Sequence, residues 1–192
     1  PEGSQMPLSA NSLFVGRLDE LHKLATWFKA GGTVGSVATI TGMGGVGKTQ
    51  LAAAFVHRYG QYFSGGVFWL NMADPASIPA QVAECGINMA EIREDYPNLE
   101  DYQQLEVRIK CRLVQTAWQS KWPRLLIFDN CESAELLVQW RPPIGASRVL
   151  VTSRRRYFGA SLGIHTLPLP QLAREQSLDL LCKFPVQVNT AS

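Results

Sequence analysis

The sequence lacks the features that mark membrane proteins, secreted proteins and strongly charged nucleic-acid binders. No apolar run approaches the roughly 18 residues that a membrane-spanning helix needs, and the first residues carry no apolar stretch typical of a secretory signal. Lys plus Arg number 18 and Asp plus Glu number 16, so the net charge is only +2. That balance argues against a basic nucleic-acid arm or an acidic tail. We therefore expect a cytoplasmic protein with no membrane partner and no direct nucleic-acid partner.

The four cysteines are too widely spaced to indicate a zinc site. No C-x-x-C pair occurs among Cys85, Cys111, Cys131 and Cys182. Without a secretory signal, reduced thiols are the default. Small buried apolar side chains are the simplest interpretation, and they suit Cys131 and Cys182 best.

The order of apolar patterns predicts an α/β domain. Apolar residues make up 46% of the 192 residues, enough for a sizeable core. Short β-branched or apolar runs alternate with helical periodicity, which indicates βαβ units and a parallel sheet. Strands are expected at 36–41, 67–70, 125–128, 148–152 and 165–169.

Helices are expected between these strands. Their predicted positions are 17–30, ended by Gly31 and Gly32, then a run that follows the glycine-rich stretch 42–49 and reaches about Tyr59, then 100–119, a helix through Leu136, Leu137 and Trp140, and 171–184. Leu105, Ile109 and Leu113 should share one face of the third helix, and Leu178, Leu181 and Cys182 should point inward from the last. Residues 75–94 are expected to be loosely helical and to lie on the surface.

Three segments are expected along the chain. Residues 1–12 are polar and rich in Pro and Ser, so we expect a flexible lead-in or residues foreign to the native protein. Residues 13–184 would form the folded domain. Residues 185–192 have no partner element and would be a truncated linker toward further domains.

The glycine-rich stretch from Gly42 to Thr49 reads GMGGVGKT and fits the phosphate-loop pattern G-x-x-x-x-G-K-[ST]. Glycines permit positive φ and close backbone approach, so successive N–H groups can converge on an anion. The following helix adds its positive N-terminal end. Lys48 would reach the β- and γ-phosphates, and the Thr49 hydroxyl would bind Mg²⁺.

Asp129 ends an apolar run that is expected to be a buried strand. A buried carboxylate is costly unless something pairs with it, and Mg²⁺ beside a phosphate loop is a natural partner. The alternative is that Asp129 caps the next helix. We favour the metal interpretation because the phosphate loop is present.

The residues after Asp129 bear on hydrolysis. Many hydrolysing relatives of such sites place an acid directly after the Mg²⁺ aspartate, but this sequence has Asn130. An amide can position water but cannot take its proton. Glu132 could be a catalytic base, although a helix first-turn acid is the simpler interpretation.

Arg154 follows the apolar strand 148–152. Guanidinium groups match phosphate oxygens in a bidentate way. If this strand lies between the other two functional strands, Arg154 could sense the γ-phosphate. Arg155 and Arg156 extend the basic run and are expected to be solvated.

The chain resembles the nucleotide-binding (NB-ARC, or AP-ATPase) domain of the STAND family of P-loop signal-transduction ATPases. The segments that carry the resemblance are 14–21 (FVGRLDEL), 41–49, 66–71, 125–130 and 148–154 (RVLVTSR). The phosphate loop is common to all P-loop NTPases, but its combination with Val-Gly-Arg and Thr-Ser-Arg is much narrower.

The resemblance implies a three-layer P-loop NTPase fold and a set of site residues. The five-stranded parallel sheet should place the sensor strand between the Walker A and Walker B strands. Adenine would lie near Phe14, Val15 and Arg17, although Val15 to Arg17 could simply be a helix start with a hydrophobic staple. Further nucleotide contacts are implied for Gly42, Gly44, Gly45, Val46, Gly47, Lys48, Thr49 and Gln50. Lys48, Asp129 and Arg154 would be the catalytic groups, with Asn130 positioning water, and Thr49 and Asp129 would hold Mg²⁺.

The resemblance also implies a molecular switch. ADP would hold a closed state, and exchange for ATP would open the full-length protein and let it self-oligomerise; this piece alone would be monomeric. With Asn130 in place and no arginine finger evident, we expect at most slow ATP hydrolysis. Alternatives are a catalytic AAA-type motor, a small-molecule kinase, or a nucleic-acid module that uses Arg154 to Arg156 with Tyr157 and Phe158; the near-neutral charge argues against the last.

Overall fold

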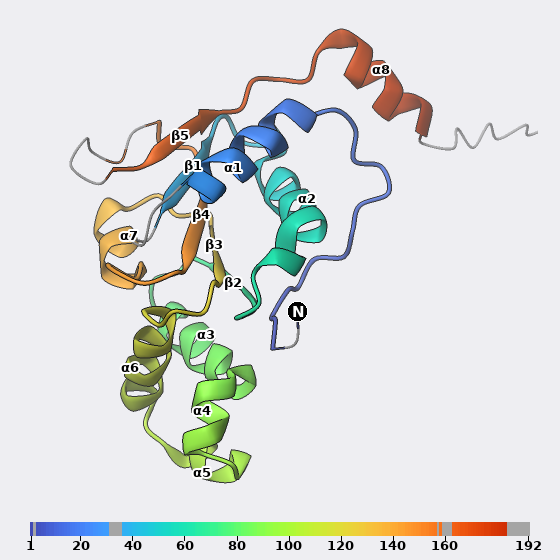
Figure 1. Ribbon diagram of the computed structural model, residues 1–192. Helices are drawn as coiled ribbons and strands as arrows, with labels where there is room; N and C mark the ends of the chain where they lie inside the picture. The colour runs from blue at the N-terminus through green and yellow to red at the C-terminus, as the bar shows by residue number, and fades with distance from the viewer. Residues whose placement is uncertain (2, 31–35, 157, 159–162, 184–192) are drawn as a thin grey trace, which may run out of the picture.

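Five parallel strands form one sheet in the order β2-β3-β4-β1-β5 in the computed structural model of the protein (Figure 1). The structure describes residues 1, 3–30, 36–156, 158 and 163–183. The strands are β1 (Val37–Thr41), β2 (Val67–Asn71), β3 (Leu125–Asp129), β4 (Arg148–Ser153) and β5 (His165–Pro168). The predicted fold class is confirmed, and β4 lies between the phosphate-loop strand β1 and the Asp129 strand β3.

Helices cover both faces of the sheet. α1 (Leu18–Ala30) and α2 (Lys48–Tyr59) pack on one face, while α3 (Ile78–Cys85), α6 (Val107–Trp118) and α7 (Ala134–Trp140) pack on the other. Alternate residues of each strand pack into the hydrophobic cores on the two faces of the sheet, so Phe68 lies in one core and Trp69 in the other. Burial on both faces explains why the central strands are continuous apolar runs.

The remaining helices are short or lie at the periphery. They are α4 (Ala90–Asp95), α5 (Leu99–Gln104) and α8 (Arg174–Lys183), together with single 3₁₀ turns at Gly60–Tyr62 and Gly86–Asn88. No helix of the described residues is long and apolar enough to cross a bilayer.

The helix predicted for 100–119 is wrong as a single element. Leu105 and Glu106 are extended, with ψ values of 148° and 143°, and they separate α5 from α6. The buried face of α6 is Cys111, Val114, Ala117 and Trp118. Ile109, which was expected to share a face with Leu105 and Leu113, is 41% exposed, whereas those two leucines pack against the core. The break at 105–106 changes the helical phase, so the predicted face does not carry through.

The segment 75–94 does not lie on the surface as expected. α3 buries Ile78, Val82 and Cys85, and α4 buries Ile92. α3 packs directly on α6. The prediction failed because small residues between the apolar ones obscured the apolar pattern of this segment.

The inward face predicted for the last helix is also wrong. Leu178 and Leu181 are 52% and 63% exposed, and Cys182 is exposed, whereas Cys131 is buried as expected. None of the described residues of α8 is buried, and Figure 1 shows this helix projecting beyond the sheet. Gly31, Gly32 and the segment from Pro185 to Ser192 lie outside the described residues.

Within the expected flexible lead-in, Gln5 pairs with the outer edge of β2. Its N–H donates to Val67 O over 2.7 Å, and its carbonyl accepts from Trp69 N over 3.0 Å. One residue of this segment thus continues the sheet beyond β2. The domain boundaries at 12–13 and 184–185 stay predictions.

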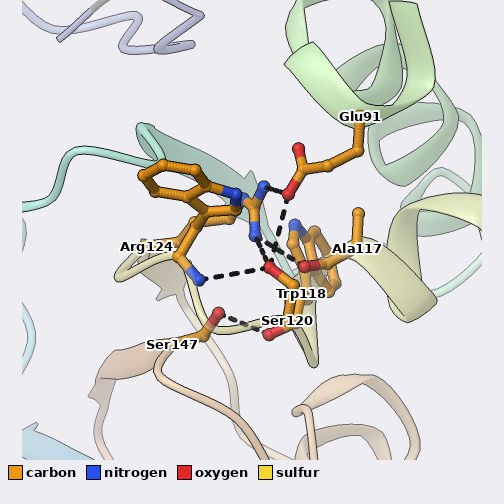
Figure 2. A network of polar contacts seen from close by, with 7 residues as sticks. Glu91, Ala117, Trp118, Ser120, Arg124 and Ser147 are labelled. Atoms are coloured by element: carbon orange, nitrogen blue, oxygen red, sulfur yellow. Dashed lines mark hydrogen bonds and ion pairs between the residues drawn. The ribbon is translucent and has the colours of Figure 1, made fainter. Parts of the chain in front are cut away.

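A buried arginine ties the helical layer to the start of β3 (Figure 2). Arg124 is 1% exposed and donates to Ala117 O over 2.6 Å and to Ser120 Oγ over 2.8 Å. It also forms an ion pair with Glu91 of α4. Glu91 of α4 therefore compensates the buried charge, and the chain at the end of α6 supplies the further hydrogen-bond acceptors.

Candidate functional site

The glycine-rich loop presents an open, concave backbone. Gly45 and Gly47 have φ values of 76° and 96°, which non-glycine residues adopt with strain. A Cβ added at Gly44, Gly45 or Gly47 would meet no atom within 4 Å. The backbone here faces open space and leaves room for a bulky group. α2 begins directly at Lys48 without a side-chain cap, so its first N–H groups are available to an anion.

Lys48 folds back over this loop. Its Nζ donates to Gly42 O over 2.9 Å and to Met43 O over 2.8 Å, and the residue is only 9% exposed. Burial lowers the pKa of the Lys48 ammonium, while the nearby charges of Glu132 and Asp129 raise it and Arg154 lowers it. A buried ammonium that donates to two backbone carbonyls is well placed to exchange those contacts for phosphate oxygens.

Asp129 is at the centre of a hydroxyl–carboxylate cluster. Its Oδ1 accepts from Thr49 Oγ1 over 3.0 Å and from Thr152 Oγ1 over 2.5 Å. The alternative role as a helix cap does not apply, because Ser133 caps α7 by accepting from Leu136 N. Hydroxyl and carboxylate oxygens are the ligands that Mg²⁺ prefers. The pair Thr49 and Asp129 therefore fits the predicted metal site, with phosphate oxygens and water needed to complete it.

Asn130 has a structural reason to be an asparagine. Its φ is 59°, in the left-handed region that Asn tolerates better than most residues. Its N–H donates to Thr152 Oγ1 over 3.0 Å. This turn directs the chain from β3 toward β4.

Glu132 lies outside α7 and reaches the end of β4. Its carboxylate accepts from Ser153 Oγ over 2.9 Å, from Arg154 N over 2.9 Å and from Arg155 N over 3.2 Å. The interpretation of Glu132 as an ordinary first-turn acid is wrong, because α7 begins only at Ala134.

The three arginines that follow β4, Arg154 to Arg156, have different surroundings. Arg154 is exposed, and its charge reaches Lys48. Arg155 donates to the backbone carbonyl of Glu132 and lies 5.8 Å from the centroid of the Phe158 ring. Arg156 lines a cavity together with Thr41 and Gly42. Tyr157 lies outside the described residues.

A cavity of about 750 Å³ opens beside α2 and collects three of the predicted nucleotide residues, Phe14, Val15 and Gln50. α8 closes its far side with Asp179, Cys182 and Lys183. Arg17 is not among the described residues lining this cavity. It is 6% exposed and donates to Pro170 O over 2.6 Å and to Glu20 Oε1 over 3.1 Å, which joins the start of α1 to the chain after β5.

Sequence reasoning gave no role to Thr152, Ser153 or the cavity-lining residues of α8. The polar end of the apolar run 148–152 was a usable signal for the first two, because carboxyl ends of parallel strands meet at one edge. No signal in the sequence placed α8 beside the same cavity as Phe14 and Val15, because the two segments are more than 150 residues apart.

A protein-family model described as the NB-ARC domain matches residues 17–191. The regulatory protein AfsR of Streptomyces coelicolor is 26% identical over 185 residues, which are 96% of this chain but 18% of the relative. The chain thus spans less than a fifth of that protein.

Solved structures share the fold at low sequence identity. Cdc6p of Pyrobaculum aerophilum has a TM-score of 0.64 at 14% identity, covering 92% of this chain and 51% of its own. The Aeropyrum pernix ORC1 protein, solved in complex with DNA, has a TM-score of 0.57 at 17% identity and covers 92% and 50%. The Aeropyrum pernix ORC2 protein, solved as ADPNP–ADP complexes, has a TM-score of 0.56 at 14% identity and covers 92% and 53%.

Proposed function

The chain belongs to the NB-ARC domain family, and on that premise we propose that it is the ATP/ADP-binding switch module of a STAND-type signalling protein. The observation that carries this proposal is the contact between Thr49 Oγ1 and Asp129 Oδ1 beside the open glycine loop. It brings a hydroxyl and a carboxylate suited to Mg²⁺ to the N-terminus of α2, where phosphate would bind.

The residues of the loop would bind the phosphates in a defined order. The N–H groups of Gly44 to Thr49 would hold the β-phosphate, and Lys48 would exchange Gly42 O and Met43 O for phosphate oxygens. When bound, Mg²⁺ would neutralise phosphate charge. Phe14, Val15 and Gln50 would hold the base in the 750 Å³ cavity.

Slow hydrolysis follows from the groups near the γ-phosphate. Asn130 offers an amide where an acid would take a proton from water. Glu132 is a carboxylate nearby, but three donors of Ser153, Arg154 and Arg155 already engage it. A slow chemical step suits a switch, since the lifetime of the ATP-bound state sets the duration of the signal.

The switch itself is a proposal about a longer protein. AfsR is described as a regulatory protein, and this chain corresponds to 18% of its length. We propose that ADP and ATP favour different arrangements of the remaining domains, and that ATP promotes self-association in the cytoplasm while this chain alone stays monomeric. Nucleotide can bias such states only by binding them unequally.

A catalytic ATPase is the second candidate, because the solved neighbours are Cdc6 and ORC proteins. A motor-like enzyme would turn nucleotide over quickly on assembly, whereas a switch would retain it. DNA is a partner in the description of ORC1, but a net charge of +2 gives this chain little attraction for phosphate backbones.

The direct test is the identity and affinity of bound nucleotide. Mass spectrometry of the supernatant after denaturing the purified chain should show ADP or ATP. Calorimetry should then show Mg²⁺-dependent binding of ADP and ATP, with GTP clearly weaker. No binding of any nucleotide would overturn the proposal, and equal binding of GTP would overturn its adenine part.

A further inference from the structure

At the end of β4, three hydrogen-bond donors bind a carboxylate of the chain itself. Ser153 Oγ and the N–H groups of Arg154 and Arg155 converge on one carboxylate, that of Glu132, over 2.9 to 3.2 Å. Successive backbone N–H groups that converge in this way bind phosphate and carboxylate alike. Ser153 is fully buried, so its hydroxyl is held in place.

This site lies where a γ-phosphate would come. Ser153 pairs with Thr41 in the sheet, and Thr41 is the residue before the glycine loop. β4 is the strand between the loop strand and the Asp129 strand. The charges of Glu132 and Arg154 both reach Lys48 and shift the pKa of its ammonium. The Glu132 carboxylate therefore shares the surroundings of the cation that would meet the γ-phosphate.

We propose that Glu132 competes with the γ-phosphate for the end of β4 and so weakens ATP binding relative to ADP. This inference rests on the proposed nucleotide function. Two effects act in the same direction. The three donors cannot serve both anions fully, and a carboxylate repels the added negative charge of ATP. ADP lacks the γ-phosphate, so it does not compete for these donors and meets a weaker repulsion.

The consequence is a built-in bias toward the ADP-bound state. ATP gains full access to the β4 donors only when Glu132 turns away, which frees Glu132, Ser133 and the start of α7 to move while Asn130 and Cys131 stay bonded to Thr152. The position of α7 would then report which nucleotide is bound, with Glu132 as the contact that breaks. This contact is a regulatory one and does not require Glu132 to take part in chemistry.

The test compares nucleotide affinities in matched variants. Glu132→Ala removes both the acceptor and the charge, and Glu132→Gln keeps the shape and one acceptor. Glu135→Gln is the control, since Glu135 is exposed at the first turn of α7 and bonds to Ser133. Calorimetry would measure binding of Mg-ADP and of a non-hydrolysable ATP analogue to the chain and each variant.

We expect the ratio of analogue to ADP affinity to rise about three- to tenfold in Glu132→Ala, less in Glu132→Gln, and by under about twofold in the control. An unchanged or lower ratio in either folded Glu132 variant overturns the inference, and a lower ratio would mean that Glu132 holds Arg154 in place for ATP. The isosteric Gln variant keeps the test valid if Ala lowers stability. Absence of nucleotide binding by the unmodified chain would overturn the proposed function, and this inference with it.

Discussion

Thr152 on β4 donates a hydrogen bond of 2.5 Å to Oδ1 of Asp129 on the neighbouring strand β3. The same hydroxyl accepts the N–H of Asn130 over 3.0 Å. Thr49 of α2 donates to the same carboxylate oxygen. Two hydroxyls from different elements thus fix the orientation of the predicted metal ligand, and Thr152 also holds the turn that follows it.

Replacing Thr152 by Val should therefore harm both stability and binding. The isosteric change leaves the Asn130 N–H without its acceptor and the buried Asp129 carboxylate without one donor, which should cost about 1–3 kcal/mol of unfolding free energy. Mg²⁺-dependent nucleotide affinity should also fall. Thr39→Val is the matched control, because the buried Thr39 Oγ1 has no hydrogen-bond partner among the described residues. Denaturant unfolding should show that variant to be as stable as the parent or more so. Equal losses in both would contradict the role of Thr152.

Replacing Lys48 by Ala should remove a phosphate contact. We expect ATP affinity to fall at least about tenfold, or roughly 1.4 kcal/mol. The exposed Lys23 of α1 offers a control variant, Lys23→Ala, with the same change of charge. Calorimetry of both would check the prediction. If the two variants bind alike, Lys48 does not contact phosphate.

Replacing Arg154 by Ala should discriminate between nucleotides. If its guanidinium binds the γ-phosphate, ATP affinity should fall about tenfold and ADP affinity by less than about twofold. Arg108→Ala on α6 is the control for a lost exposed arginine. Equal losses for ATP and ADP would return Arg154 to the role of a solvated surface cation.

The strands and the phosphate loop could be predicted from the sequence because both are local signals. Leu125 to Phe128 is an unbroken apolar run, and such a run is typical of a parallel strand buried on both faces. The loop pattern carries its own chemistry. The strand order was expected only from the family resemblance, since no local pattern tells which strands are neighbours.

The helical faces and the second set of site residues depend on long-range contacts. The helix breaks at Leu105 without a Gly or Pro in the sequence to indicate it, and the predicted face fails because Ile109 is exposed while Cys111 is buried. The contact of Glu132 with Arg154 depends on β3 and β4 being adjacent. The apolar spacing of α8 predicted a buried face, yet its leucines Leu178 and Leu181 are exposed. A helical pattern alone therefore does not show what the helix packs against.

The ion pair of Glu91 with Arg124 should make stability depend on pH. Partial burial alone would raise the pKa of the Glu91 carboxyl, but its hydrogen bonds, chiefly to Arg124, lower the pKa below the ordinary value. The stabilisation is therefore complete above the unfolded pKa of about 4.3 and is lost as pH falls through the lower folded value.

Glu91→Gln should then destabilise the chain by about 1 kcal/mol at pH 7, a modest value because solvent partly screens Glu91. The difference from the parent should shrink below about pH 4 as the parent carboxylate is protonated. Glu94→Gln, on the exposed side of the same helix, should show no such pH-dependent difference. Denaturant unfolding at several pH values would check this, and a difference that stays constant with pH would contradict it.

Slow turnover is the last prediction, and it separates a switch from a motor. Asn130 cannot take a proton from water, and its left-handed backbone and bond to Thr152 give it a structural role instead. Glu132 is the other candidate base, but its carboxylate already accepts hydrogen bonds from Ser153, Arg154 and Arg155, which leaves it poorly placed to bind a water. An arginine supplied from a partner can be worth roughly 10³–10⁵ in rate where it is used, and purified chain at low concentration would act without one.

Phosphate release should therefore stay below about 1 s⁻¹, the lower end of typical enzyme rates. Lys48→Ala serves as the control for contaminating ATPases. A rate above about 1 s⁻¹ that disappears in Lys48→Ala would overturn the switch proposal and support the catalytic ATPase instead.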